Sequence, residues 1–130
     1  ATDEVVIKTS FDIAPSYLLH TNADMVQHAL RNLLDNAVKF TSKGEICLSV
    51  RQANKGLNKY VEFVVSDTGI GIPETEQERI FERFYKVDKF TPGTGLGLSV
   101  CRVIANILKG SISIDKSYTT GARFIFSIPE

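Results

Sequence analysis

The sequence predicts one α/β domain of the α+β type, a two-layer sandwich in which three helices cover one face of a mixed, mostly antiparallel sheet. Five segments have the β-branched composition or the apolar alternation typical of strands, and three have apolar residues at helical spacing. Short turns join most neighbouring strands, which favours antiparallel pairing over a doubly wound parallel sheet. The 130 residues are enough for one domain, spanning 1–130, around one core.

The first elements are a strand and a long helix. Residues Val5–Phe11 are rich in β-branched side chains and predict the strand. Thr21 or Asn22 can cap a helix that ends near Phe40. The apolar stripe of this helix consists of Val26, Leu30, Leu33 and Ala37.

A hairpin and a second helix are predicted next. Strands Glu45–Gln52 and Tyr60–Ser66 flank a polar loop over residues 53–59. Pro73 suits a first helical turn, and the acidic residues and apolar face that follow, as far as Phe84, predict a helix.

The last third of the chain predicts a lid, a third helix and two closing strands. Residues 86–94 have no apolar period, so we expect a loop that can act as a lid. A helix from about Leu96 to Leu108 follows, and Gly110 can take the left-handed conformation beyond its end. The alternating residues of the closing strands are Ile112 and Ile114, then Phe124, Phe126 and Ile128.

Composition excludes several classes of function. Lys and Arg together number 15, as do Asp and Glu, so the net charge is zero and nucleic acid is not expected as a partner. Cys47 and Cys101 lack the spacing of a metal site or a disulfide framework, which fits a reducing compartment. Because the chain has no apolar run of roughly 18 residues and no signal peptide, we expect a cytoplasmic domain cut from a larger protein.

A turn at Asp67–Ile72 follows directly after an apolar strand. Gly69 and Gly71 let the backbone approach a flat ligand, and the Asp67 carboxylate can accept a hydrogen bond from an exocyclic amine. Adenine carries this amine, whereas guanine has an oxygen there, so a fixed carboxylate would select adenine. These residues alone are equally compatible with a tight turn in which Asp67 bonds to its own backbone.

A second glycine-rich turn runs into the third predicted helix. Its residues are Gly93, Thr94, Gly95, Leu96, Gly97 and Leu98. The first amides of a helix and its dipole form an anion site, for which phosphate is the obvious ligand. The turn is neither a Walker loop nor a dinucleotide fingerprint, because no Gly-Lys-Ser/Thr follows and Leu98 replaces the third glycine. A flexible linker is an equal alternative.

Asn32, Asn36 and Lys39 form a polar stripe beside the buried face of the first helix. The amide oxygen of Asn36 suits Mg²⁺, which takes phosphate oxygens together with one or two protein ligands. The ammonium group of Lys39 could meet a phosphate charge. An ordinary boundary between core and solvent is the alternative interpretation.

Further candidates lie in and near the lid. Arg83, Lys86 and Lys89 could contact phosphates, although a solvated basic patch also explains them. Phe81 and Phe84 are more typical of core or lid packing than of base stacking.

In combination, these motifs resemble the N, G1, F and G2 boxes of the catalytic ATP-binding domain of sensor histidine kinases. The four stretches are Asn32–Phe40, Asp67–Ile72, Phe81–Tyr85 and Gly93–Leu98, in that order. The likeness covers essentially the whole chain, down to Ile128–Pro129. It implies the fold shared with gyrase, heat-shock chaperone and mismatch-repair ATPases, which holds Mg-ATP between the helices and a mobile lid.

The resemblance also implies roles for individual residues. Asn36 would bind Mg²⁺, and Asp67 would recognise adenine. Asn32 and Lys39 would lie beside the phosphates, with Arg83 as a further catalytic candidate. The other expected ATP-binding residues are Gly69, Gly71, Ile72, Phe84, Tyr85, Lys86, Gly93, Thr94, Gly95, Leu96, Gly97 and Leu98.

Asn32 stands where the gyrase and chaperone relatives, and the serine kinases of the family, typically carry Glu. That Glu activates a water or a hydroxyl, whereas an amide cannot accept a proton at neutral pH. An imidazole nucleophile has its own lone pair and needs less help. We therefore expect the domain to position Mg-ATP and neutralise its charge.

The nucleophile is expected on another domain. Neither His20 nor His28 has the acidic neighbour of a phosphoacceptor motif, so we expect the acceptor histidine on an upstream dimerisation domain, with a response-regulator receiver domain as the next partner. The parent protein is expected to be a homodimer, often membrane-bound. The alternatives are a regulatory module that binds nucleotide without transferring phosphate, and a serine kinase, which Asn32 disfavours.

Overall fold

The computed structural model describes residues 5–12, 21–41, 43–82 and 97–130. This part contains a five-stranded sheet with the order β1-β2-β3-β5-β4. The strands are β1 (Val5–Asp12), β2 (Gly44–Lys55), β3 (Asn58–Asp67), β4 (Ser111–Ile114) and β5 (Arg123–Pro129). β1 pairs with β2 in parallel, and the other three pairs are antiparallel. The prediction of a mixed, mostly antiparallel sheet is confirmed.

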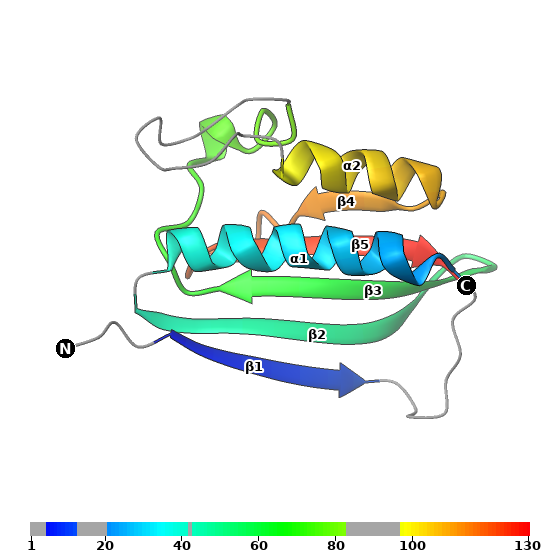
Figure 1. Cartoon of the computed structure of the whole chain (residues 1–130), viewed down its shortest axis with the longest axis horizontal. Coiled ribbons are helices and arrows are strands. Elements are labelled where there is room, and N and C mark those ends of the chain that lie inside the picture. The colour runs from blue at the N-terminus through cyan, green and yellow to red at the C-terminus, as the bar shows by residue number, and fades with distance from the viewer. Residues whose placement is uncertain (1–4, 13–20, 42, 83–96) are drawn as a thin grey trace.

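Two α-helices, α1 (Ala23–Phe40) and α2 (Gly97–Ile107), lie side by side on one face of this sheet (Figure 1). α1 packs over β2 and β3, and α2 packs over β4 and β5. Asn22 caps α1 by accepting a hydrogen bond from the Met25 amide at 3.1 Å, as its sequence position predicts. None of the helices in the described part of the chain is long and apolar enough to cross a membrane.

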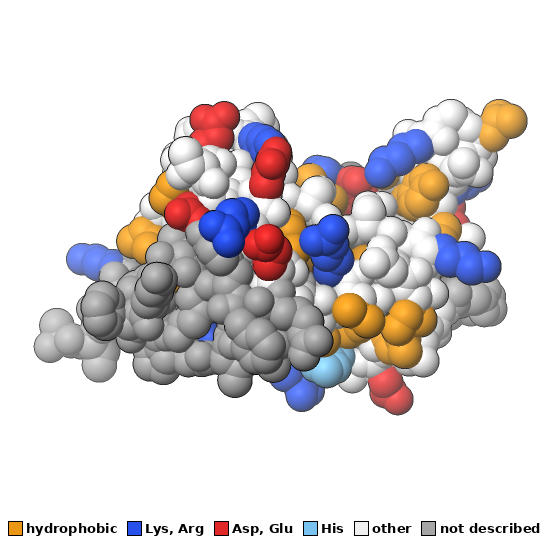
Figure 2. All heavy atoms as spheres, turned by 90° about the horizontal axis from the view of Figure 1, so that it is seen from above, with side chains coloured by type: hydrophobic (Ala, Val, Ile, Leu, Met, Phe, Trp, Pro, Cys, Tyr) orange, Lys and Arg blue, Asp and Glu red, His pale blue; other side chains and the backbone are white. Residues whose placement is uncertain are grey.

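The core fills the space between the helices and the sheet. α1 contributes one apolar stripe, and β3 and β5 contribute alternate residues from the covered face. The largest fully buried apolar side chains are Leu33, Ile46, Val61, Val65, Phe124, Phe126 and Ile128. On the surface in Figure 2, charged side chains of both signs are interspersed with small groups of hydrophobic ones.

The expected second α-helix after Pro73 is wrong for the described residues. A 3-10 helix, η1 (Glu74–Glu76), follows Pro73, and the chain then continues in turns to Glu82. Main-chain bonds there span three residues rather than four, as from Glu82 to the Arg79 carbonyl. These tighter turns bring Ile80 into the core. The covering layer in the described part of the chain therefore has two α-helices, not three.

The predicted polar loop over residues 53–59 is also wrong. β2 and β3 continue until Lys55 pairs with Asn58, so only Gly56 and Leu57 form the turn. Gly56 has a φ of +63°, which a two-residue hairpin turn requires at that position. The polar residues belong to an exposed extension of the hairpin, where both faces meet water.

At the C-terminal end of α2, the left-handed conformation is taken by a different residue from the expected one. Lys109, not Gly110, takes the left-handed conformation, with a φ of +62°. The amide of Gly110 donates to the Ala105 carbonyl at 2.8 Å, which closes the helix. A Cβ at Gly110 would collide with the Ser127 carbonyl, so glycine is needed there because the chain passes directly against β5.

Candidate functional site

The turn after β3 is fixed by hydrogen bonds to three other parts of the fold. The Thr68 amide donates to the Glu45 carbonyl at 3.0 Å, where β2 begins. The Ile70 amide donates to the carbonyl of Phe40, the last residue of α1, at 3.2 Å. The Asp67 amide donates to the Ala122 carbonyl, just before β5, at 2.9 Å. The turn is therefore a rigid part of the scaffold.

The Asp67 carboxylate is buried and oriented by main-chain donors. Its Oδ1 accepts hydrogen bonds from the Gly69 amide at 2.9 Å and from the Ala122 amide at 3.3 Å. Burial raises the pKa of Asp67, and these two hydrogen bonds oppose the rise. No hydrogen bond within the described part of the chain engages Oδ2. The second oxygen is therefore available as an acceptor for a ligand amine.

Gly69 and Gly71 serve the fold as well as a ligand site. A Cβ at Gly69 would collide with the Phe40 carbonyl, so glycine lets the turn approach the end of α1. Gly71 has a φ of +74°, which glycine adopts without strain. A Cβ there would also lie 3.2 Å from the Gly121 carbonyl. The alternative of a tight turn with self-bonded Asp67 is thus part of the structure, and it leaves Oδ2 available.

The other half of the site lies where α1 meets the start of α2. A Cβ at Gly97, the first residue of α2, would be 3.9 Å from the Asn32 Cβ. The Asn32 side chain also lies close enough to the Cys101 thiol, one turn further along α2, to lower the pKa of that thiol. Asn36 is half-buried and Lys39 is exposed. The structure therefore places Asn32 beside a helix N-terminus, where anions bind.

Cys101 joins the two helices. Its thiol is buried and donates a hydrogen bond to the Ala29 carbonyl at 3.3 Å. Burial raises the pKa of Cys101 to about 12, although the neighbouring Asn32 side chain acts in the opposite direction. The thiol therefore stays protonated at neutral pH and holds α1 and α2 in register.

The remaining predicted site residues divide into two groups. Ile72 and Leu98 are half-buried and pack against the core. Phe81 packs edge-to-face on Phe124 with ring centroids 6.0 Å apart, which supports the packing interpretation of this residue. The candidates that lie outside the described residues are Arg83, Phe84, Tyr85, Lys86, Lys89, Gly93, Thr94, Gly95 and Leu96.

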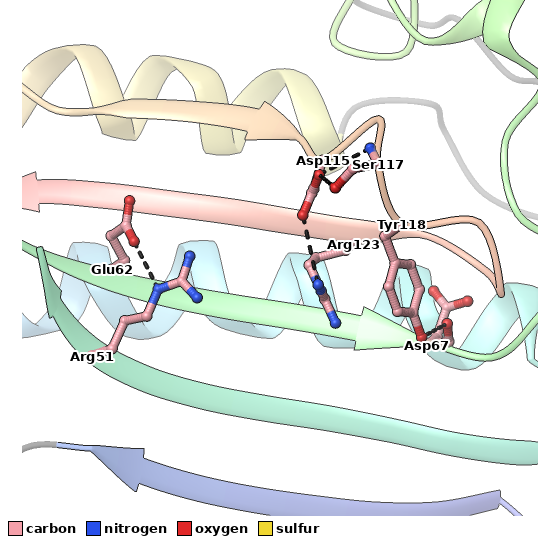
Figure 3. Close-up of polar contacts among 7 residues, drawn as sticks. All are labelled: Arg51, Glu62, Asp67, Asp115, Ser117, Tyr118 and Arg123. Carbon is pink, nitrogen blue, oxygen red and sulfur yellow. Dashed lines mark hydrogen bonds and ion pairs between the residues drawn. The ribbon is translucent and has the colours of Figure 1, made fainter.

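Sequence reasoning missed the residues behind the Asp67 turn. Figure 3 shows Tyr118, Arg123, Asp115 and Ser117 gathered between β4 and the start of β5, with Tyr118 directed at Asp67. Asp115, Ser117 and Tyr118 belong to the connection between β4 and β5, and Arg123 is the first residue of β5. The pairing of the end of β3 with the start of β5 would have been the signal, because it places this connection beside Asp67.

The family of the chain follows from a match over most of its length. A family model described as "Histidine kinase-, DNA gyrase B-, and HSP90-like ATPase" matches residues 21–130. The chain belongs to this family. Within it, the chain is a catalytic ATPase domain of the sensor histidine kinase type, as the four motifs predicted.

The relatives of this histidine kinase ATPase domain are sensor kinases. The chain is 37% identical over 134 residues to the sensor-like histidine kinase SenX3 of Mycolicibacterium smegmatis, covering 100% of this chain and 34% of that protein. It is 40% identical over 114 residues to the adaptive-response sensory kinase SasA of Crocosphaera subtropica, covering 85% and 29%. The chain therefore spans about a third of the length of these relatives.

Solved structures agree with this assignment. Full-length ShkA in complex with AMPPNP has a TM-score of 0.83 and 30% identity, over 96% of this chain and 25% of ShkA. The mycobacterial sensor histidine kinase MprB has a TM-score of 0.81 over 96% of this chain and 83% of that one. Its identity of 24% makes it a likeness of fold alone.

Proposed function

We propose that this domain binds Mg-ATP and donates the γ-phosphoryl group to a histidine on a separate dimerisation domain, in two-component signal transduction. The observation that carries the proposal is the Asp67 carboxylate, buried, held by two main-chain amides through Oδ1 and left with Oδ2 as an acceptor. An acceptor fixed in this way pairs with the exocyclic amine of adenine and opposes the oxygen of guanine.

The second half of α1 and the start of α2 would supply the phosphate side. Asn32 and the amides at the N-terminus of α2 would bind phosphate oxygens, and Lys39 would neutralise charge from its exposed position. Asn36 fits Mg²⁺ because its amide oxygen is a hard ligand, and its half-buried side chain lies one helical turn from Asn32. When bound, the ion would offset negative charge on the transferring phosphate.

Asn32 limits what the site can do. A neutral amide cannot remove a proton from water or from a serine hydroxyl, but an imidazole nitrogen attacks with its own lone pair. The new N–P bond forms as the bond from the γ-phosphorus to the bridging oxygen breaks. ADP leaves with that electron pair, and the imidazole proton passes to solvent. Because the site lacks a general base, it favours phosphoryl transfer to histidine over hydrolysis of ATP or transfer to serine.

The parent protein is then a sensor kinase. Its phosphoacceptor domain would be the direct partner, and a response-regulator receiver domain would take the phosphoryl group from the histidine. The relatives support this view, because each is named a sensor kinase and extends well beyond the matched domain. A homodimeric, often membrane-bound parent with this domain in the cytoplasm belongs to the same proposal.

Transfer between separated domains tests this function. The chain is mixed with the phosphoacceptor domain of its parent kinase, Mg²⁺ and ATP labelled at the γ-phosphate. We expect label on the acceptor histidine, no label without Mg²⁺, and none with Asn36→Ala. An acceptor domain with its histidine changed to serine should remain unlabelled. Tight ATP binding without transfer would contradict the proposal and favour a regulatory nucleotide-binding module.

A further inference from the structure

The ladder between β3 and β5 changes its pattern at Asp67. Ser66 pairs with Arg123, and Asp67 and Ala122 face each other next. In a regular hydrogen-bonded pair, each amide would donate to the main-chain carbonyl opposite. Asp67 does donate to the Ala122 carbonyl, but the Ala122 amide donates to Asp67 Oδ1. The Asp67 carboxylate thus takes the place of its own carbonyl.

The displaced carbonyl is bound by Tyr118. The Tyr118 hydroxyl donates to the Asp67 carbonyl at 2.8 Å, reaching across from the connection between β4 and β5 (Figure 3). Without this donor, the carbonyl would be the natural partner of the Ala122 amide, because a regular ladder places it there. The carbonyl and the carboxylate would then compete for one amide.

Tyr118 is itself held in place. The Arg123 guanidinium lies 4.1 Å from the centre of the Tyr118 ring, a cation–π contact. Asp115 Oδ2 lies 3.6 Å from Arg123 Nη1 and fixes the guanidinium. Asp115 Oδ1 accepts bonds from the Ser117 amide at 3.0 Å and from the Ser117 hydroxyl at 2.6 Å. The connection therefore presents the hydroxyl in one orientation.

We propose that Tyr118 is a positioning residue for adenine recognition. Its hydroxyl holds the Asp67 carbonyl out of the ladder, so that the carboxylate stays in the ladder with Oδ1 occupied and Oδ2 left for the exocyclic amine. This inference rests on the proposed function, because it assumes that Asp67 reads adenine. Tyr118 acts through Asp67 and does not contact the base.

The test uses a nucleotide that lacks only the exocyclic amine, the group that Asp67 is proposed to bind. Purine riboside triphosphate has the ring and phosphates of ATP but no exocyclic amine. Dissociation constants for ATP and for this analogue are measured by calorimetry with Mg²⁺ for the unchanged chain, Tyr118→Phe and a control, Tyr60→Phe. Tyr60 lies on the same strand as Asp67 but near its opposite end, where the ring contacts Lys55.

We expect Tyr118→Phe to raise the dissociation constant of ATP about fivefold, the factor carried by one hydrogen bond of ordinary net strength. The constant for the analogue should stay unchanged, and Tyr60→Phe should change neither. In an Asp67→Asn background, Tyr118→Phe should have no further effect on the ratio of the two constants.

Two results would overturn the inference. If Tyr118→Phe weakened the binding of both ligands equally, Tyr118 would be a structural residue. If it weakened the binding of neither, Tyr118 would have no part in positioning Asp67. In both cases the unchanged chain would still prefer ATP, so the proposed function would stand. If the unchanged chain bound both ligands equally, adenine recognition by Asp67 would fail, and the role of Tyr118 would fail with it.

Discussion

A side chain at Gly121 would collide with the main-chain carbonyl of Asp67, so the turn before β5 packs directly on the end of β3. In the turn that follows β3, a side chain at Gly69 would collide with the Phe40 carbonyl. Backbone therefore meets backbone at both contacts, and neither can be relieved by rotating a side chain. The Asp67 carboxylate is held between two close approaches that only glycine permits.

We predict that Gly69→Ala and Gly121→Ala each lower the free energy of unfolding by about 1–3 kcal/mol, the usual cost of overpacking a tight site. Urea denaturation measures this change. Gly97→Ala is the matched control, because the nearest atom to its added Cβ is 3.9 Å away, an ordinary contact. A Gly121→Ala variant as stable as the unchanged chain would show that the turn can move away from Asp67.

We predict that Asp67→Asn raises the dissociation constant of ATP by about tenfold or more, the size of a hydrogen bond to a charged acceptor. The amide can still accept from Gly69 and Ala122 through its oxygen. Its NH₂ group then occupies the position of Oδ2 and opposes the adenine amine. Calorimetry with Mg-ATP measures the loss, and an unchanged far-ultraviolet circular dichroism spectrum shows that the fold is kept. Unchanged affinity would contradict the assignment of the base pocket.

The same substitution predicts a pH dependence of stability. Burial raises the pKa of Asp67 above its ordinary value of 3.8, so the folded chain binds this proton more tightly than the unfolded chain. Ionisation of Asp67 then costs stability as the pH rises from 3.8 through the folded pKa. The stability of Asp67→Asn relative to the unchanged chain should be greatest at pH 7 and should shrink towards pH 4. A difference that grows towards acid would contradict a raised pKa.

The elements of the fold could be predicted wherever apolar residues recur at the spacing of a helix or a strand, because that spacing marks the buried face. The stripe of α1 and the alternation of β5 both depend on contact with one core, and both elements were found where expected. The extension of the hairpin was not predictable, since polar residues on two exposed faces look like a loop. The helix after Pro73 failed for the opposite reason. Its residues favour a helix locally, but Ile80 and Phe81 reach the core through tighter turns.

In the candidate site, only the residues expected to contact the ligand directly could be predicted from the sequence. Asp67 and Asn32 have side chains whose chemistry points to a ligand, and their motifs place them on a strand end and a helix. Tyr118 has no such signal, because its role depends on the Asp67 carbonyl, which lies 51 positions away in the chain. Contacts of that kind follow from the strand order and the register, which local sequence patterns do not contain.

The two cysteines provide a last prediction, because their surroundings differ. Cys101 is fully buried, donates to the Ala29 carbonyl and has a pKa of about 12, whereas Cys47 is half-buried in β2. At pH 8 the thiolate fraction of Cys101 is about a thousandfold below that of an ordinary thiol. A disulfide reagent such as Ellman's should therefore modify Cys47 in the folded chain and Cys101 only on unfolding.

The control is Cys47→Ser, which should remove the fast phase and leave a reaction whose rate follows global unfolding in urea. Mg-ATP should slow this remaining reaction, because a ligand that binds only the folded chain lowers the unfolded fraction. Rapid modification of Cys101 without urea would show that α1 and α2 separate in the native state. The Asn32 side chain would then lose its place beside Gly97, since the Asn32–Gly97 approach and the Cys101–Ala29 hydrogen bond both join α1 to α2.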